Sequence, residues 1–184
     1  MIDLSDKDFK STLKETSLDD SNKEDKKYMT ESELPAIDFD LVKRKYANSL
    51  GLSEDKAHSV DAIVITKDEN LEYFIEFKNG KVEGKTKSNI RDKIRDTLLI
   101  YGDITLKNVS YTRKNTVFIL VYNEEKNRRG KSLDKMRSHW MDRAQTEERR
   151  FDLEKFEDIF FKEVHTYTEK QFDNFLKEIS SSVL

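Results

Sequence analysis

The chain has 184 residues, of which 39% are charged and 35% hydrophobic, with a formal net charge of −3, so we expect one domain with a substantial core. It has no cysteine, which excludes disulfide bonds, thiolate metal sites and a cysteine nucleophile. There is neither an apolar run of about eighteen residues nor a secretory signal pattern at residues 1–6, so we expect no membrane span and a cytoplasmic location.

The charges are distributed unevenly along the chain. Residues 1–33 hold 10 Asp and Glu against 6 Lys and Arg, whereas residues 78–150 hold 19 Lys and Arg against 10 Asp and Glu. A basic excess of this kind attracts a phosphodiester backbone. On charge alone, a set of solvated helix faces explains the same pattern equally well.

The acidic start of the chain predicts a flexible or loosely docked tail over residues 1–33, with little that packs in a core. A single α/β domain is expected over residues 34–184. It opens with a helix that Asp38 caps and Gly51 ends. The apolar stripe of this helix consists of Phe39, Leu41, Val42, Tyr46 and Leu50.

A β-hairpin is predicted next, because two apolar runs, Ala62–Ile65 and Tyr73–Phe77, flank a polar turn. Glu76 and Lys78 are two residues apart, so their side chains leave the strand from the same face. Asp61 begins the partner strand and reaches the same edge of the sheet. Two carboxylates and an ammonium converging there suit a hard divalent cation and an anionic substrate, although a surface strand with a Glu–Lys charge pair is the simpler alternative.

A basic helix is predicted from Thr86, with Ser88 as its N-cap and Gly102 as its end. Its inward face consists of Ile90, Ile94, Thr97, Leu98 and Tyr101. The basic residues of this helix are expected outside or near the site; they are Lys87, Arg91, Lys93 and Arg95.

The unbroken apolar run from Asn115 to Tyr122 predicts a central strand buried on both faces. A charged loop over residues 123–131, a charged helix over 132–149, a strand over 161–167 and an amphipathic helix capped by Thr168 follow. The predicted fold is therefore α/β (α+β), with a mixed central β-sheet flanked by helices. The last helix carries its apolar side at Phe172, Phe175, Leu176 and Ile179.

The elements Val60-Asp61 and Glu76-Phe77-Lys78, followed by Gly80 and a basic helix, resemble the PD-(D/E)xK superfamily of metal-dependent nucleases. The resemblance covers residues 36 to about 123 and implies a restriction-endonuclease-like core. It departs from the family in one respect. The family places a strand before the one that bears the Asp, and residues 52–59 are too polar and too short to supply it.

The resemblance implies that Asp61, Glu76 and the backbone carbonyl of Phe77 bind Mg²⁺ or Mn²⁺, whose preferred ligands are oxygens. Lys78 would orient the attacking water or stabilise the developing charge. Asp40 would be an additional metal ligand, although an acidic residue in a first helical turn more often complements the helix dipole.

The resemblance also implies that the basic helix contacts the scissile phosphate. Lys87, Arg91 and Arg95 are four residues apart and share one helix face. The alternative is a solvated stripe paired with Asp92 and Asp96. We expect further nucleic-acid contacts from Arg128 and Arg129 in the charged loop.

The expected function is metal-dependent cleavage of nucleic acid, with DNA favoured over RNA. A catalytically inactive nuclease-like fold that binds a protein partner, as an immunity or antitoxin module does, is the alternative, and the sequence pI of about 5.8 favours it. A third interpretation is nucleic-acid binding without turnover. Metal binding separates the first from the other two, and salt-dependent DNA affinity separates the third from the second.

Overall fold

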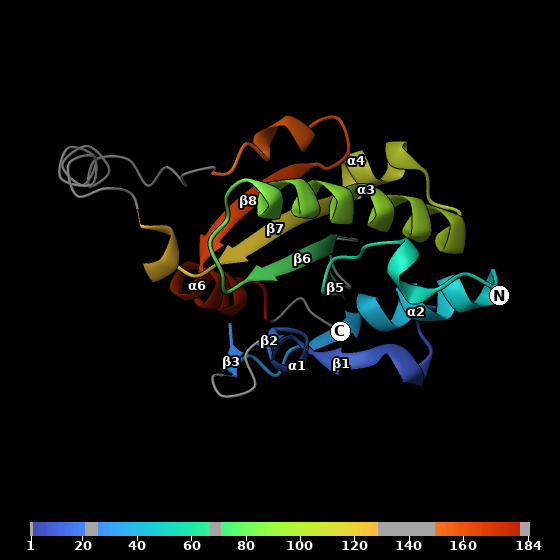
Figure 1. The fold of residues 1–184 in the computed structure, drawn as a ribbon, viewed down its shortest axis with the longest axis horizontal. Coiled ribbons are helices and arrows are strands. Elements are labelled where there is room, and N and C mark those ends of the chain that lie inside the picture. The colour runs from blue at the N-terminus through green and yellow to red at the C-terminus, as the bar shows by residue number, and fades with distance from the viewer. Residues whose placement is uncertain (1, 21–25, 67–70, 129–149, 181–184) are drawn as a thin grey trace.

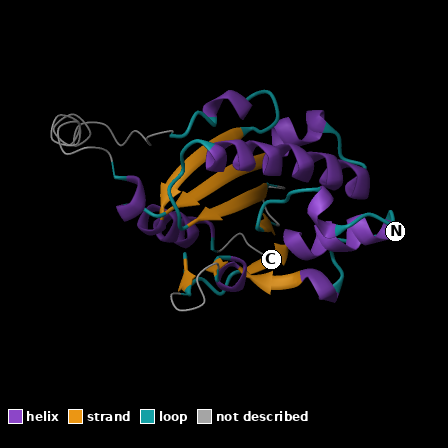
Figure 2. Cartoon of the chain, in the orientation of Figure 1, coloured by secondary structure: helices purple, strands orange, loops and turns teal. Residues whose placement is uncertain are grey.

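A mixed six-stranded sheet with helices on both faces forms the centre of the computed structural model, which describes residues 2–20, 26–66, 71–128 and 150–180 (Figures 1 and 2). In spatial order the strands are β1 (Lys10–Thr12), β4 (Pro35–Asp38), β5 (Ala62–Ile65), β6 (Glu72–Lys78), β7 (Thr116–Tyr122) and β8 (Glu163–Thr168). Neighbours from β1 to β6 are antiparallel, whereas β6, β7 and β8 run parallel. The predicted fold class, with its mixed sheet flanked by helices, is confirmed.

The core consists of two hydrophobic clusters, one on each face of the sheet. One hydrophobic cluster packs against helices α2 and α3, and the other packs against α1 and α6. The helices are α1 (Leu13–Thr16), α2 (Phe39–Ser49), α3 (Lys85–Thr105), α4 (Val109–Asn115) and α6 (Glu169–Ile179). Short 3-10 turns cover Lys7–Phe9, Glu54–Lys56, Glu125–Asn127 and Glu154–Phe156, and a small second sheet pairs β2 (Leu18–Asp19) with β3 (Lys27–Tyr28). Across the ranges that the structure describes, no helix is both long and apolar enough to cross a membrane.

Alternate side chains of β6 point to opposite faces of the sheet. Tyr73, Ile75 and Phe77 point into the cluster beside α6, whereas Phe74 packs in the cluster beside α3. Glu76 lies between Ile75 and Phe77 in the strand, so its side chain faces α3 as well. Strand β7 is buried along its whole length, as its apolar sequence predicts.

The helix caps agree with the sequence in two places and differ in two others. Asp38 accepts a hydrogen bond from the Leu41 N–H, and Thr168 forms a capping box, as predicted. Helix α3 begins at Lys85, so the prediction of Ser88 as its N-cap is wrong. Gly102 lies inside this helix instead of ending it. A Cβ at that position would lie 3.2 Å from the Lys107 carbonyl oxygen, so the glycine admits the returning chain.

Most of the remaining predicted elements are present. All five residues of the predicted inward face of α3 are buried. The predicted strand at 161–167 begins later, at Glu163, and the last helix buries Phe172 and Leu176. The predicted helix at 132–149 lies outside the described residues.

The N-terminal segment contributes to the core, so the prediction of a loosely docked tail with little core packing is wrong for its described part. Strand β1 pairs with β4 at the edge of the main sheet. Phe9, Leu13 and Met29 are each 2% exposed or less. Phe9 joins the cluster beside α3, whereas Leu13 and Met29 join the cluster beside α6.

Strand β4 is a second element that the sequence did not predict. It covers four residues before α2 and pairs antiparallel with β5. The sheet therefore has a strand ahead of the one that follows Asp61, and this strand lies before α2, not in residues 52–59.

Candidate functional site

Asp61 lies directly before β5 and is fixed against the neighbouring strand. Its Oδ2 accepts a hydrogen bond of 2.7 Å from the Phe77 N–H, and its own N–H donates to the Ile75 carbonyl at 3.1 Å. The two bonds flank Glu76 on β6, so the carboxylates of Asp61 and Glu76 meet at one edge of the hairpin, as the sequence predicts.

Glu76 and Lys78 lie on the same face of β6, which confirms the prediction from their spacing. Lys78 Nζ is 2.5 Å from Glu76 Oε1. The Glu76 side chain is fully buried, whereas that of Lys78 is 24% exposed. The strand therefore carries a buried carboxylate with an ammonium that still reaches the surface.

A second ammonium, that of Lys93 on α3, bridges the two carboxylates. Lys93 Nζ lies 2.9 Å from Asp61 Oδ1, 2.9 Å from Glu76 Oε2 and 2.8 Å from Glu76 Oε1. The sequence predicts Lys93 only outside or near the site. Its position three residues after Ile90 and four before Thr97, both fully buried, was the available signal, because these spacings put it on the inward helix face.

For both Glu76 and Lys93, burial and the oppositely charged neighbours shift the pKa in opposite directions. Burial raises the pKa of Glu76, and the Asp61 carboxylate raises it further, while Lys93 and Lys78 oppose the rise. Burial would lower the pKa of Lys93, but the Glu76 and Asp61 carboxylates outweigh it and raise this pKa above its usual range. The two carboxylates therefore favour the charged form of Lys93.

Glu76 Oε1 is a buried atom whose polar environment is incomplete. It forms no hydrogen bond of acceptable geometry within the described residues, although both ammonium groups lie within 2.8 Å of it. Its contacts are therefore mainly electrostatic. A cation that coordinates carboxylate oxygens directly does not depend on hydrogen-bond angles and would suit this atom.

A cavity of about 360 Å³ opens beside the cluster. Asp61, Phe77 and Lys78 line one side of it, together with Asp40 from the first turn of α2. The Phe39 N–H donates to the Asp61 carbonyl at 3.2 Å, which holds the start of α2 against the site. The sequence therefore placed Asp40 correctly in the neighbourhood of Asp61.

Asp40 has partners of its own at this position. It accepts a hydrogen bond of 2.5 Å from the Ser59 hydroxyl, and Lys43 Nζ lies 3.7 Å away. Asp38, by contrast, serves as the helix cap. These contacts leave Asp40 facing the cavity without joining the Asp61–Glu76–Lys93 cluster.

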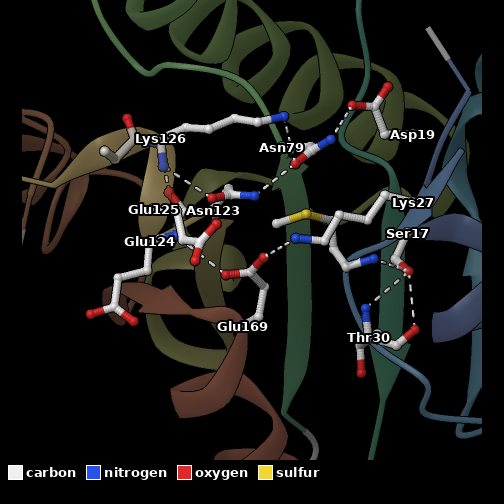
Figure 3. Close-up of polar contacts among 12 residues, drawn as sticks. Ser17, Asp19, Lys27, Thr30, Asn79, Asn123, Glu124, Glu125, Lys126 and Glu169 are labelled. Carbon is white, nitrogen blue, oxygen red and sulfur yellow. Dashed lines mark hydrogen bonds and ion pairs between the residues drawn. The ribbon is translucent and has the colours of Figure 1, made fainter. Parts of the chain in front are cut away.

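The N-terminal segment forms the opposite wall of the cavity, with Ser17, Asp19 and Met29 among its residues. Figure 3 shows how this wall is attached to the rest of the domain. Asp19 accepts a hydrogen bond from the Asn79 side chain at 2.9 Å, and the Asn79 oxygen accepts one from Asn123 at 2.8 Å. Lys27 forms an ion pair of 2.7 Å with Glu169 of α6. The cavity thus lies between the end of β6 and a segment that the sequence assigned to a tail.

None of the predicted nucleic-acid-binding residues that the structure describes lines this cavity. Lys87 Nζ is 2.9 Å and Arg91 3.8 Å from Asp152, and Arg95 is 3.6 Å from Asp92. Arg128 is 3.9 Å from Glu125, and Arg129 lies outside the described residues. The pairing of Arg95 with Asp92 agrees with the paired-stripe alternative, whereas Lys87 and Arg91 share an acid from a distant segment.

The donor set suits a small, hard cation. Over the described part of the chain, no group of three or more His, Asp and Glu side chains is placed to hold a metal. Mg²⁺ commonly binds through one or two carboxylates and keeps several waters, so a third carboxylate is not required. Asp61 and Glu76 provide two carboxylates that already converge on one cation, Lys93 Nζ.

No protein-family model matches the chain, and neither a curated protein nor a solved structure matches it significantly. The similarity to PD-(D/E)xK nucleases therefore rests on the motif residues, Asp61, Glu76 and Lys78. It remains a prediction.

Proposed function

We propose that the protein is a metal-dependent phosphodiesterase that cleaves nucleic acid, with DNA as the favoured substrate. The observation that carries the proposal is the convergence of Asp61 and Glu76 on a single cation position beside the cavity lined by Lys78. A buried carboxylate beside a partly buried one in an apolar sheet costs stability unless cations compensate them. A functional role accounts for that cost.

Each residue has a distinct part in the proposed reaction. Asp61 and Glu76 would hold Mg²⁺ or Mn²⁺, with the Phe77 carbonyl as a further donor, and such an ion would supply an activated water and neutralise charge on the phosphate. The Phe77 N–H keeps the Asp61 carboxylate in place. Lys78, partly exposed at the cavity, orients the attacking water and stabilises the developing negative charge. Asp40 supplies a third acid from the cavity wall.

Contacts to the nucleic-acid backbone come from the basic side of α3. Lys87, Arg91 and Arg95 exchange their carboxylate partners for phosphates when the substrate binds, and Arg128 and Arg129 extend the contact. Binding through such residues is strongly salt-dependent, because it releases counterions from the nucleic acid. A cytoplasmic location is part of the same proposal.

One observation favours a second candidate, a nuclease-like scaffold that binds a protein partner without turnover. Lys93 and Lys78 together balance the charges of Asp61 and Glu76, so the cluster is electrically neutral without a metal. In this alternative Lys93 is a permanent substitute for the cation. The acidic pI of about 5.8 agrees with it.

Degradation of supercoiled plasmid and of single-stranded RNA with Mg²⁺ or Mn²⁺ tests the proposal. The comparison is between the wild type, Asp61→Ala and Lys78→Ala, with Asp55→Ala on an exposed turn as the matched control. We expect cleavage by the wild type and the control, and none by the two site variants or with a chelator. Absence of cleavage from all four folded proteins, without a metal-induced rise in melting temperature, would favour the scaffold.

A further inference from the structure

The two lysines of the site differ in what they contact. Lys78 pairs with Glu76, at 2.5 Å, and lines the cavity. Lys93 bridges Asp61 and Glu76, with its Nζ 2.8 to 2.9 Å from an oxygen of each. Lys93 therefore occupies the point on which the carboxylates converge, whereas Lys78 lies to one side of it.

We propose that Lys93 Nζ and the divalent cation bind alternately at this one position, so that Lys93 acts as an internal competitor that sets the affinity of the site for metal. The inference rests on the proposed function, because it concerns the same two carboxylates. It adds a role for a residue of α3 that the Asp…Glu-x-Lys motif does not include.

Charge and distance make it unfavourable for Lys93 Nζ and a divalent cation to occupy this position at the same time. A small divalent cation bound to both carboxylates lies about 2.1 Å from their oxygens. The Lys93 ammonium is already within 2.9 Å of the same oxygens, so two cations would be held in contact where the side chains are largely buried. Like charges at such a distance repel strongly where little water screens them.

The carboxylates are fixed, and Lys93 is the component that can move. Asp61 is held by the Phe77 N–H, and Glu76 is fully buried within a central strand. Lys93 reaches the site on a flexible four-carbon chain from α3, and its side chain is 18% exposed. Its ammonium therefore has a route towards solvent when a metal arrives. In the metal-free protein it compensates the buried carboxylates.

Mn²⁺ affinity is measured by isothermal titration calorimetry on the full chain. It distinguishes competition between Lys93 and the metal from a general effect of removing one positive charge. The variants are Lys93→Met and Lys78→Met, since each removes one ammonium within 2.8 Å of Glu76 but only Lys93 bridges to Asp61. We expect the Kd of Lys93→Met to be lower than that of the wild type by about tenfold, a typical size for coupling between two ligands. Lys78→Met should change the Kd much less.

A second measurement uses the wild type and does not depend on how well a variant folds. Release of Lys93 by metal should increase its acylation by an amine-reactive ester, followed by mass spectrometry of the peptide that contains it. We expect labelling of Lys93 to rise with Mn²⁺, while that of Lys107, paired with the buried Glu72 at the other end of β6, stays constant.

The outcomes distinguish this inference from the proposed function. Equal Kd changes in the two variants, or unchanged labelling of Lys93 in a wild type that binds Mn²⁺ and cleaves DNA, would overturn the competition and leave the function intact. If neither the wild type nor Lys93→Met binds Mn²⁺, the metal site and the inference both fail. A Kd decrease confined to Lys93→Met, with labelling that follows metal occupancy, would support the competition.

Discussion

The Asp61 carboxylate accepts a 2.7 Å hydrogen bond from the Phe77 N–H, so a side chain at the start of one strand is fixed by the backbone of the next. Asp61→Asn keeps an oxygen that can accept this bond, whereas Asp61→Ala leaves a half-buried N–H without its partner. We therefore expect Asp61→Ala to lower the free energy of unfolding by about 1–3 kcal/mol, and Asp61→Asn by less. Urea denaturation measures both values, and equal losses would contradict the proposed anchoring role.

Glu76 makes stability depend on pH in a defined direction. Burial raises its pKa in the folded protein, and Asp61 adds to the rise. A carboxyl group with a raised folded-state pKa contributes stability that is complete below its unfolded pKa, about 4.3, and is lost as pH rises through the folded value. The free energy of unfolding of the wild type should therefore fall relative to Glu76→Gln as the pH increases from about 4 towards neutrality.

Urea denaturation of the two proteins across this pH range, without metal, is the measurement. Glu178→Gln, at an exposed position of α6, is the matched control and should follow the wild type. A difference between wild type and Glu76→Gln that stays constant with pH would show that the Glu76 pKa is not shifted by folding.

Glu72 forms a second buried cluster at the other end of β6. It is 2% exposed and accepts hydrogen bonds from Tyr101, Tyr111 and Lys107, with Lys107 Nζ at 2.5 Å. Removing one partner of a buried ion pair typically costs about 3–5 kcal/mol. Because the Lys107 side chain is 35% exposed, we expect a smaller loss, about 2 kcal/mol, in Lys107→Met.

Thermal and urea unfolding of Lys107→Met, beside the exposed Lys114→Met, checks this value. Plasmid cleavage should remain at the wild-type level in both variants, since Glu72 begins β6, four residues before Glu76. Loss of cleavage in a folded Lys107→Met would contradict the location of the site.

The N-terminal segment should behave as part of the domain. Leu13 is fully buried in the cluster beside α6, so Leu13→Ala should destabilise the protein by about 3 kcal/mol, within the range for buried leucines. Leu50 is 56% exposed, and Leu50→Ala should change the free energy of unfolding by less than about 0.5 kcal/mol. Similar small changes in both would show that the segment is loosely docked after all.

The parts of the site that the sequence predicted are those that local periodicity determines. The two-residue repeat of a strand places Glu76 and Lys78 on one face, and the pairing of the hairpin brings Asp61 to the same edge. Lys93 comes from another element, and its spacing from Ile90 and Thr97 indicates only that it lies on the inward face of α3. Its role depends on how α3 packs across β6, which only the folded chain determines.

The failures in predicting the fold also have physical causes. Strands β1 and β4 have three and four residues, too few for an alternating pattern to stand out from charged surroundings. Gly102 has the sequence pattern of a helix end, whereas its lack of a side chain serves a close approach by Lys107. The acid partner of Lys87 and Arg91 is Asp152, which is distant in the sequence and therefore invisible to a local analysis. Metal and nucleic-acid binding remain predictions.

Nicking of supercoiled plasmid in Mn²⁺, compared between the wild type and Asp61→Asn, tests the central claim most directly. Asp61→Asn keeps the size of the side chain and an acceptor for the Phe77 N–H, so it removes chiefly the charge that would hold the metal. The account predicts metal-dependent nicking by the wild type and its loss, by at least about a hundredfold, in a folded Asp61→Asn protein. Undiminished nicking by that variant, or none by a wild type that binds Mn²⁺, would contradict it.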